Sequence, residues 1–182
     1  DVYKRQAYTV NELKAINAGT TGDITLNNAG VALSGKVADI KAAFSGTITT
    51  HTGTVTISDA ATTDVTATDI TSINTTNTGT ITVANAIDIN GSGFEVAAAF
   101  AAIDINTGNA TATITGNDYT VAQLKAINNA TTGVIVLVDP SINLTGTAAD
   151  LVSAFAGTVT THNGDITITD EENTILNVFD LI

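Results

Sequence analysis

The sequence predicts an α/β fold: a repeat solenoid of about six coils, each made of a helix, a strand and a shorter strand, with a parallel sheet on one side. Three observations lead to this prediction. Long segments recur along the chain, apolar spacing changes from helical to alternating inside each recurring unit, and most helical segments open with a capping motif. A unit this short cannot bury its apolar face alone, but stacked units can. A closed α/β sandwich is the alternative.

Long repeats divide the chain. Residues Tyr8–Asn17 (YTVNELKAIN) return as Tyr119–Asn128 (YTVAQLKAIN), and GTITTH at 46–51 returns as GTVTTH at 157–162. A more diverged copy lies between these two. We therefore expect a single repeat array over residues 7–182, with repeats at 7–63, 64–118 and 119–182. The ends show no obvious polar cap, so we also expect this array to be a fragment of a longer one.

Each long repeat splits into two related units. Their apolar anchors lie 26 to 30 residues apart, at Leu13, Ile40, Ile70, Val96, Leu124 and Leu151. Around an anchor the spacing is helical, as in Val10, Leu13 and Ile16. It then alternates, as in Thr54–Ile57, which predicts a strand with one buried face. A shorter alternating patch predicts a second strand, at 31–33, 87–89 and 142–144.

The start of most helical segments carries Ser or Thr with an acid or amide three residues later, which is the capping-box pattern. The pairs are Thr9 with Glu12, Thr66 with Asp69, Ser92 with Glu95, Thr120 with Gln123, and Thr147 with Asp150. Since Gln123 takes the acid's place, a negative charge is dispensable there. We therefore interpret the recurring acids as structural. Before Val37, where Lys36 replaces the hydroxyl residue, Ser34 is the expected cap.

Residues 1–6 differ from everything that follows. The codons of Asp-Val-Tyr-Lys-Arg-Gln can be written GAT GTG TAT AAG AGA CAG, which matches the transposase end of a tagmentation sequencing adaptor. Our hypothesis is that 1–6 is translated adaptor, to be left out of reasoning about the fold. This hexapeptide carries Arg5, the only arginine in the chain.

Composition excludes several function classes. Eighteen acidic against six basic residues give a formal net charge of −12 and a pI near 4.1, which argues against a nucleic-acid groove or binding to an anionic membrane. The absence of cysteine excludes disulfides and a cysteine nucleophile. No apolar run approaches the roughly 20 residues of a membrane span. The expected partners are neighbouring repeats of the same polypeptide, without nucleic acid and without membrane insertion.

Two histidines and several carboxylates are candidate ligands. His51 and His162 are repeat equivalents that precede Gly53 and Gly164, and we interpret them as turn residues bonded to backbone rather than as metal ligands. Acidic residues gather at unit junctions, with Asp59 near Asp64 and Asp170 beside Glu171 and Glu172. Such oxygen-rich turns could hold calcium weakly. We otherwise expect no cofactor, no metal and no catalytic residue.

Threonine pairs supply the most specific candidate surface. In Thr-x-Thr, alternation places both hydroxyls on one face of a strand. The candidate binding residues are Thr54, Thr56, Thr80, Thr82, Thr111, Thr113, Thr167 and Thr169. A flat threonine array is similar to those of ice-binding solenoids, although threonine also simply favours strands. The strand at 134–136 lacks threonine, and its Val134 and Val136 predict a stretch covered on both faces.

The motif T-V-x-x-L-K-A-I-N, with T-T-G-x-I-x-L and A-D-[IL]-x-x-A-F-x-G-T-[IV]-T-T-H after it, resembles tandem-repeat regions of very large secreted bacterial surface proteins, such as adhesins and hemolysin-like proteins. The resemblance implies extracellular or cell-surface display and a stalk or adhesive role. We therefore expect a non-enzymatic structural module. The alternatives are a glycan- or ice-binding module that uses the threonine face, and a polysaccharide-processing enzyme. Few aromatic residues are left for an enzyme of that kind, because Phe44, Phe100 and Phe155 occupy core positions of the repeat.

Overall fold

The structure is a computed structural model that describes residues 7–170. Residues 1–6 and 171–182 lie outside the described range. The adaptor hypothesis for 1–6 therefore falls outside it, and so do Glu171 and Glu172 of the calcium prediction.

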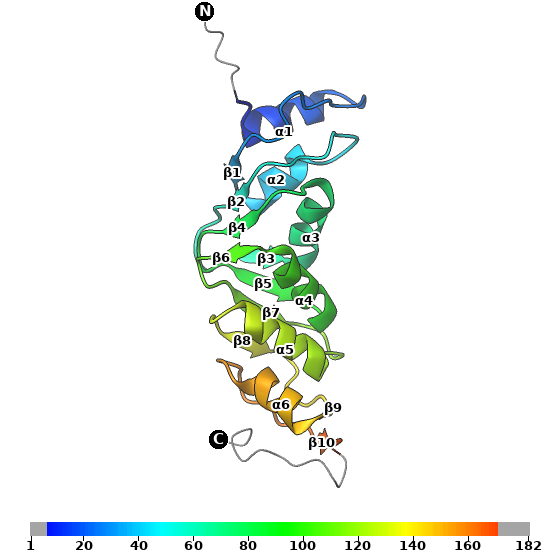
Figure 1. Cartoon of the computed structure of the whole chain (residues 1–182), viewed down its shortest axis with the longest axis vertical. Coiled ribbons are helices and arrows are strands. Elements are labelled where there is room, and N and C mark those ends of the chain that lie inside the picture. Colours follow the sequence, from blue (N-terminus) through cyan, green and yellow to red (C-terminus); the bar gives the residue numbers. More distant parts are fainter. Residues whose placement is uncertain (1–6, 171–182) are drawn as a thin grey trace, which may run out of the picture.

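The described chain has an α/β architecture in which six helices follow one another along the long axis, with parallel strands beside them (Figure 1). The helices are α1 (Val10–Gly19), α2 (Val37–Ala43), α3 (Ala67–Thr76), α4 (Gly93–Ala102), α5 (Val121–Ala130) and α6 (Ala148–Phe155). Each helix packs against the next one in chain order. We call the residues from the start of one helix to the start of the next a coil, and number the coils 1 to 6.

The ten strands of the described residues form three parallel sheets. The first contains β1 (Leu33–Gly35), β2 (Val55–Ile57), β4 (Ile81–Val83) and β6 (Ile105–Asn106). The second contains β3 (Asp64–Thr66), β5 (Asp88–Gly91), β7 (Thr111–Ile114) and β8 (Ile135–Leu137). The third pairs β9 (Leu144–Gly146) with β10 (Ile166–Ile168). The prediction of a single sheet on one side was too simple. Where a coil has two strands, its first strand pairs with one strand of the neighbouring coil and its second strand pairs with another, so two separate ladders form.

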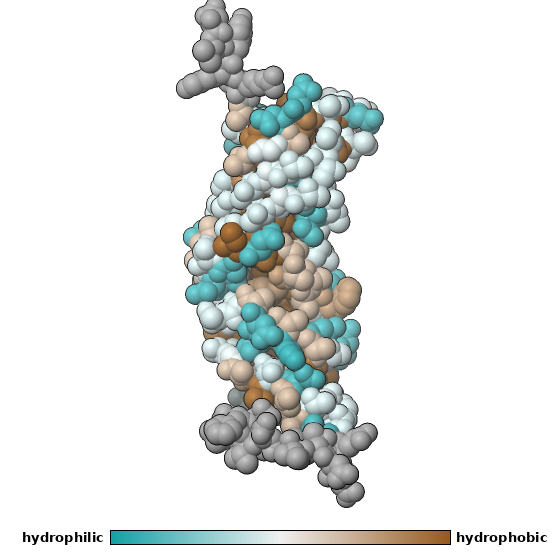
Figure 2. Space-filling model, viewed as in Figure 1, coloured by the Kyte–Doolittle hydropathy of each residue, from teal (hydrophilic) through white to brown (hydrophobic). Residues whose placement is uncertain are grey.

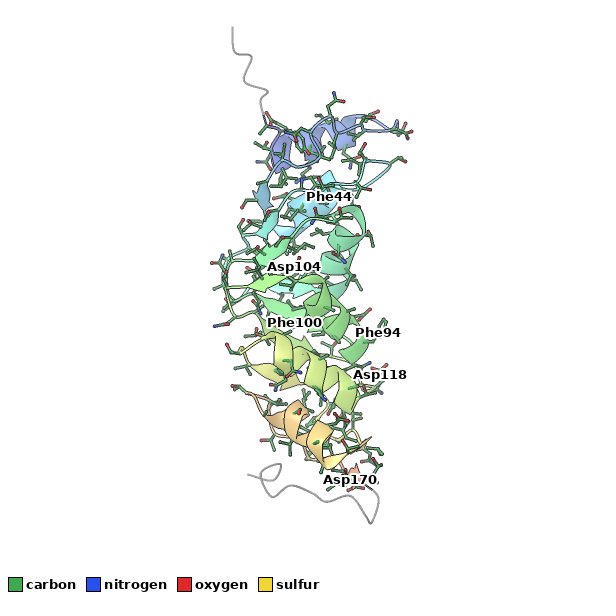
Figure 3. The ribbon with its side chains drawn as sticks, in the orientation of Figure 1. Phe44, Phe94, Phe100, Asp104, Asp118 and Asp170 are labelled. Atoms are coloured by element: carbon green, nitrogen blue, oxygen red, sulfur yellow. The ribbon has the colours of Figure 1, made fainter. Side chains whose placement is uncertain are left out.

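The core lies between the helices and the inward faces of the strands. The predicted anchors of all six helices are buried, and β2, β4 and β8 each bury their first and third residues. This confirms the helical and alternating spacing. Phe44 and Phe100, labelled in Figure 3, are buried as expected. Phe155 is half-buried.

Three predicted capping boxes are confirmed. At the starts of α1, α4 and α5, the side chains of Thr9, Ser92 and Thr120 accept the backbone N–H three residues on, and the side chain of that residue accepts the cap residue's own N–H. Half of the fourth is present, because Thr147 Oγ1 accepts from the backbone N–H of Asp150 at 3.2 Å. These bonds satisfy N–H groups that a helix leaves without partners at its start.

Two predicted caps were wrong. Thr66 makes no side-chain capping bond at the start of α3, and the carboxylate of Asp69 is paired with Lys41. Ser34 does not cap α2 either. There, Oδ2 of the buried Asp59 accepts from the N–H of Val37 at 2.8 Å. Asp170 repeats this contact on Ala148 at the start of α6. A carboxylate from 22 residues further along the chain therefore stabilises both helix starts.

Neighbouring coils approach each other at a column of glycines. The members are Gly53, Gly79, Gly108, Gly133 and Gly164, and at each of them an added Cβ would collide with backbone of the preceding coil. At Gly79, for example, it would meet the carbonyl oxygens of Thr52 and Gly53. The missing side chain thus sets how closely two coils can stack.

We predict that Thr120→Ala lowers the free energy of unfolding by about 1 kcal/mol, because it removes the hydroxyl that caps α5. The matched control is Thr66→Ala, which has the same place in the repeat but no capping bond to lose. Urea denaturation of both variants checks this. Equal losses in the two variants would contradict the assignment of caps.

Candidate functional site

The structure divides the eight candidate threonines among three sheets. Thr54 and Thr56 lie at β2 and Thr80 and Thr82 at β4, both in the first sheet. Thr111 and Thr113 belong to β7 in the second sheet, and Thr167 and Thr169 lie at β10 in the third. The candidate residues therefore form separate patches rather than one continuous face.

In the first sheet, hydroxyl side chains stand next to one another across the strands. Ser34 pairs with Thr56, and Thr56 with Thr82, in the parallel register. The row ends on β6 at Ile105, which lies opposite Thr82. The side chain of Ile105 is exposed. Thr56 and Thr82 themselves are only half exposed. This row is thus three hydroxyls long and bounded by an aliphatic residue.

The second sheet carries a shallow groove of about 320 Å³ on its outward face. Its lining is Thr62, Asp64, Ala86, Asp88, Thr111, Thr113, Val134 and Val136. The Asp88 carboxylate accepts the hydroxyls of Thr111 at 3.1 Å and Thr113 at 2.8 Å. Asp64 faces Asp88 across the β3–β5 ladder. The threonines of this patch are therefore held by a carboxylate, and the groove is acidic on one side and aliphatic on the other.

Val134 and Val136 correct a sequence prediction. They were expected to be covered on both faces, but Val134 is exposed and Val136 is half-buried. The register explains this, because Val136 lies opposite Thr113, which lies opposite Asn90 in an outward row. Its neighbour Ile135 is the residue that points into the core.

The two histidines connect coils, and the prediction that they bond to backbone is confirmed. His51 is fully buried, with Nε2 2.7 Å from the carbonyl oxygen of Val31 in coil 1 and Nδ1 2.7 Å from Oδ1 of Asn77 in coil 3. Its ring packs on Phe44. His162 Nε2 makes the equivalent contact to the carbonyl oxygen of Ile142 at 2.7 Å.

These histidines belong to a column that sequence reasoning missed. A polar residue stands two positions before each glycine of the column: His51, Asn77, Asn106, Thr131 and His162. Thr131 also donates to a carbonyl oxygen of the previous coil, that of Ala110, at 2.5 Å. The recurring polar–x–Gly spacing was the available signal, but it is only three residues long and its polar member changes type.

The carboxylates singled out for calcium take different places. Asp59 and Asp170 each accept a backbone N–H at a helix start, and Asp64 lies in the groove of the second sheet. Within residues 7–170, no group of three or more His, Cys, Asp or Glu side chains converges as a metal site would. Weak calcium binding stays a prediction.

A set of ion pairs links consecutive helices on their outer side. Lys14 of α1 pairs with Asp39 of α2, Lys41 of α2 with Asp69 of α3, and Lys125 of α5 with Asp150 of α6. In each pair, the lysine is the fifth residue of its helix and the aspartate is the third of the next. The hydrogen bond and charge of Lys14 lower the pKa of Asp39, and Lys125 followed by Thr147 lowers that of Asp150.

Two further surface features complete the description. Phe94, at the start of α4, is 69% exposed, and weakly hydrophobic surface surrounds α4 and its alanines (Figures 2 and 3).

None of the helices in residues 7–170 combines the length and apolar character that crossing a bilayer requires.

Comparison with known proteins finds no matching family model, no matching curated protein and no matching solved structure.

We predict that acid destabilises the fold through the helix-linking ion pairs. The folded state lowers the pKa of Asp39 and Asp150, so their contribution is complete above the unfolded pKa of about 4 and is lost as the pH falls through the lower folded value. Melting temperature should therefore decline below about pH 4.

The variant Asp39→Asn should lower the melting temperature at pH 7 and make its decline below pH 4 less steep. The exposed Asp118, changed to asparagine, is the control, because it removes the same net charge from a residue outside the three ion pairs. Thermal melts from pH 7 to pH 2.5 measure both. Identical curves for the two variants would contradict a role for the Lys14–Asp39 pair.

Proposed function

We propose that this chain is part of an α/β solenoid that serves as a non-enzymatic structural or stalk module of a large extracellular repeat protein or adhesin. One observation carries the proposal. Each helix packs on the next helix in the chain, and each strand ladder joins a coil to its immediate neighbour. An arrangement of nearest-neighbour contacts grows in length with each coil and needs no closing contact.

The equivalence of coils 1–2 and coils 5–6 supports an array that can be extended. Tyr8 donates its hydroxyl to the carbonyl oxygen of Asn28, and Tyr119 does the same to Asp139. The Lys14–Asp39 pair recurs as Lys125–Asp150. Contacts that recur at matching positions indicate that the unit, rather than its place in the chain, determines how it stacks.

An extracellular setting is supported by the motif resemblance and by composition. The net charge of −12 keeps a long rod soluble through mutual repulsion, and the chain has no cysteine that could oxidise. In this proposal the partners are neighbouring repeats of the same polypeptide, and the outward threonines serve the sheets in which they lie.

A second candidate is a glycan-binding module, with the groove of the second sheet as the observation that favours it. Asp64 and Asp88 offer acceptors to sugar hydroxyls, and Val134 and Val136 offer an aliphatic wall. Ice binding is less favoured, because the eight threonines are spread over three sheets rather than one flat array.

The proposal is tested by small-angle X-ray scattering of the unaltered chain. A rod should give a radius of gyration well above the roughly 16 Å of a compact protein of this length, with a constant cross-section. A value near 16 Å would contradict it. The same sample is assayed on immobilised polysaccharides. Retention that Thr113→Tyr abolishes without lowering the melting temperature would support the glycan-binding module, and reproducible cleavage would overturn the non-enzymatic reading.

A further inference from the structure

At the α1 end of the described chain, apolar and polar side chains in about equal share line an open surface. A hollow of about 750 Å³ there is lined by Tyr8, Leu13, Ile16, Ile24, Thr25, Leu26, Asn27 and Asn28. Ile16 is 52% exposed, and Ile24 and Leu26 are only half-buried. Figure 2 shows hydrophobic atoms at the surface of this end, beside α1. We call Tyr8, Ile16, Ile24 and Leu26 the end surface.

The same four positions are covered in the third repeat. Tyr119 is 2% exposed, and Ile127 and Ile135, which correspond to Ile16 and Ile24, are fully buried. Leu137, the counterpart of Leu26, is buried as well. The local structure is otherwise alike, because both places have the capping box, the tyrosine hydrogen bond and the lysine–aspartate pair. The difference therefore lies in what is stacked on top.

Coil 4 is what covers the third repeat. Its helix α4 packs on α5, with Gly93 so close to Tyr119 that an added Cβ would collide. Its strand β7 pairs with β8, aligning Ala112 with Ile135 and Ile114 with Leu137. At the end surface, the segment around Ile24 is bonded to coil 2 through Thr47 and Thr49. The opposite edge of the segment around Ile24 is equivalent to the edge of β8 that pairs with β7.

From this, and from the hypothesis that residues 1–6 are translated adaptor, we infer that the end surface is a stacking site for a further coil of the same repeat, built like residues 92–118 and ending at Ala7 in the same polypeptide. The inference rests on the proposed stalk function and deepens it, because it names the partner of that surface. The covering coil adds a parallel strand beside Ile24–Leu26 and an alanine- and glycine-rich helix face over Tyr8 and Ile16.

A second copy of this chain fits the end surface less well. The helix that covers Tyr119 begins with Gly93, where an added Cβ would collide with the Tyr119 side chain. The last helix of the described residues, α6, begins with Ala148 instead. Stacking coil 6 of a second copy on the end surface in the same way would therefore bring that Cβ against Tyr8.

The inference is tested by a chimera in which residues 64–118 are joined directly to Tyr8 of the 8–182 chain, so that the junction between coils 4 and 5 is reproduced. Hydrogen exchange is followed at Ile24–Leu26, with Ile135–Leu137 as the internal standard. Exchange at Ile24–Leu26 should slow at least about tenfold relative to the unaltered chain and approach that of the standard. An unchanged rate with the standard still protected would overturn the inference.

A pair of variants in the unaltered chain keeps the test independent of how well the chimera folds. Ile16→Lys should shift the melting temperature by less than about 2 °C because its side chain is already exposed, whereas Ile127→Lys should unfold the chain. A large loss from Ile16→Lys would show the surface to be covered already and would overturn the inference.

The scattering experiment separates the two proposals. If scattering shows the unaltered chain to be a rod but the chimera gives no protection at Ile24–Leu26, the stalk proposal is supported and the stacking site is overturned. Protection at Ile24–Leu26 that rises with the concentration of the unaltered chain identifies a second copy as the occupant, and overturns the covalently joined coil.

Discussion

The closeness of neighbouring coils is the constraint on which the rest of this structure depends. At the glycine column, backbone of one coil rests directly on backbone of the one before it, with no space for a side chain. At this distance N–H and C=O groups of successive coils meet as parallel ladders, so the backbone of the strands is satisfied between coils, while that of the helices is satisfied within them. The buried anchors then fill the space between the helices and the sheets.

Polar contacts across coils add specificity to this stacking. His51 touches three successive coils, and the helix-linking lysine–aspartate pairs join helices on the outside. Exposed pairs of this kind contribute little each, whereas a buried ring with both nitrogens bonded fixes one register. The stacked coils therefore combine a uniform backbone spacing with side-chain contacts that favour one register of stacking over the others.

Much of the fold could be predicted from the sequence because periodicity and repetition reflect burial directly. The anchors, the two strands in each of coils 2 to 5, and three capping boxes followed from residue spacing alone. Thr66 shows the limit: its motif matches that of Thr147, and Asp69 and Asp150 each pair with a lysine of the preceding helix, yet only Thr147 makes the capping bond. The local sequence does not separate the two. Asp59, which caps α2 from a distant part of the chain, was out of reach for the same reason.

The candidate site was less predictable than the fold. Alternation placed the hydroxyls of Thr111 and Thr113 on one face of β7, where both donate to Asp88. Which strands share a sheet, however, depends on the stacking of coils. The groove of the second sheet combines Asp64, Asp88 and Val134 from three coils, and nothing in the sequence indicated that these three residues would lie together. The valines in particular read as core from their type, although the register turns Val134 and Val136 outward.

The most direct test of the central claim is equilibrium unfolding of Gly79→Ala beside Gly19→Ala. An alanine at Gly79 forces backbone of coils 2 and 3 apart, so we expect a loss of about 1–3 kcal/mol in the free energy of unfolding. Gly19, the last residue of α1, has open space around it, and alanine there should be neutral or stabilising by up to about 1 kcal/mol. Equal stability of Gly79→Ala and the unaltered chain would contradict the claim that this close approach holds the coils in place.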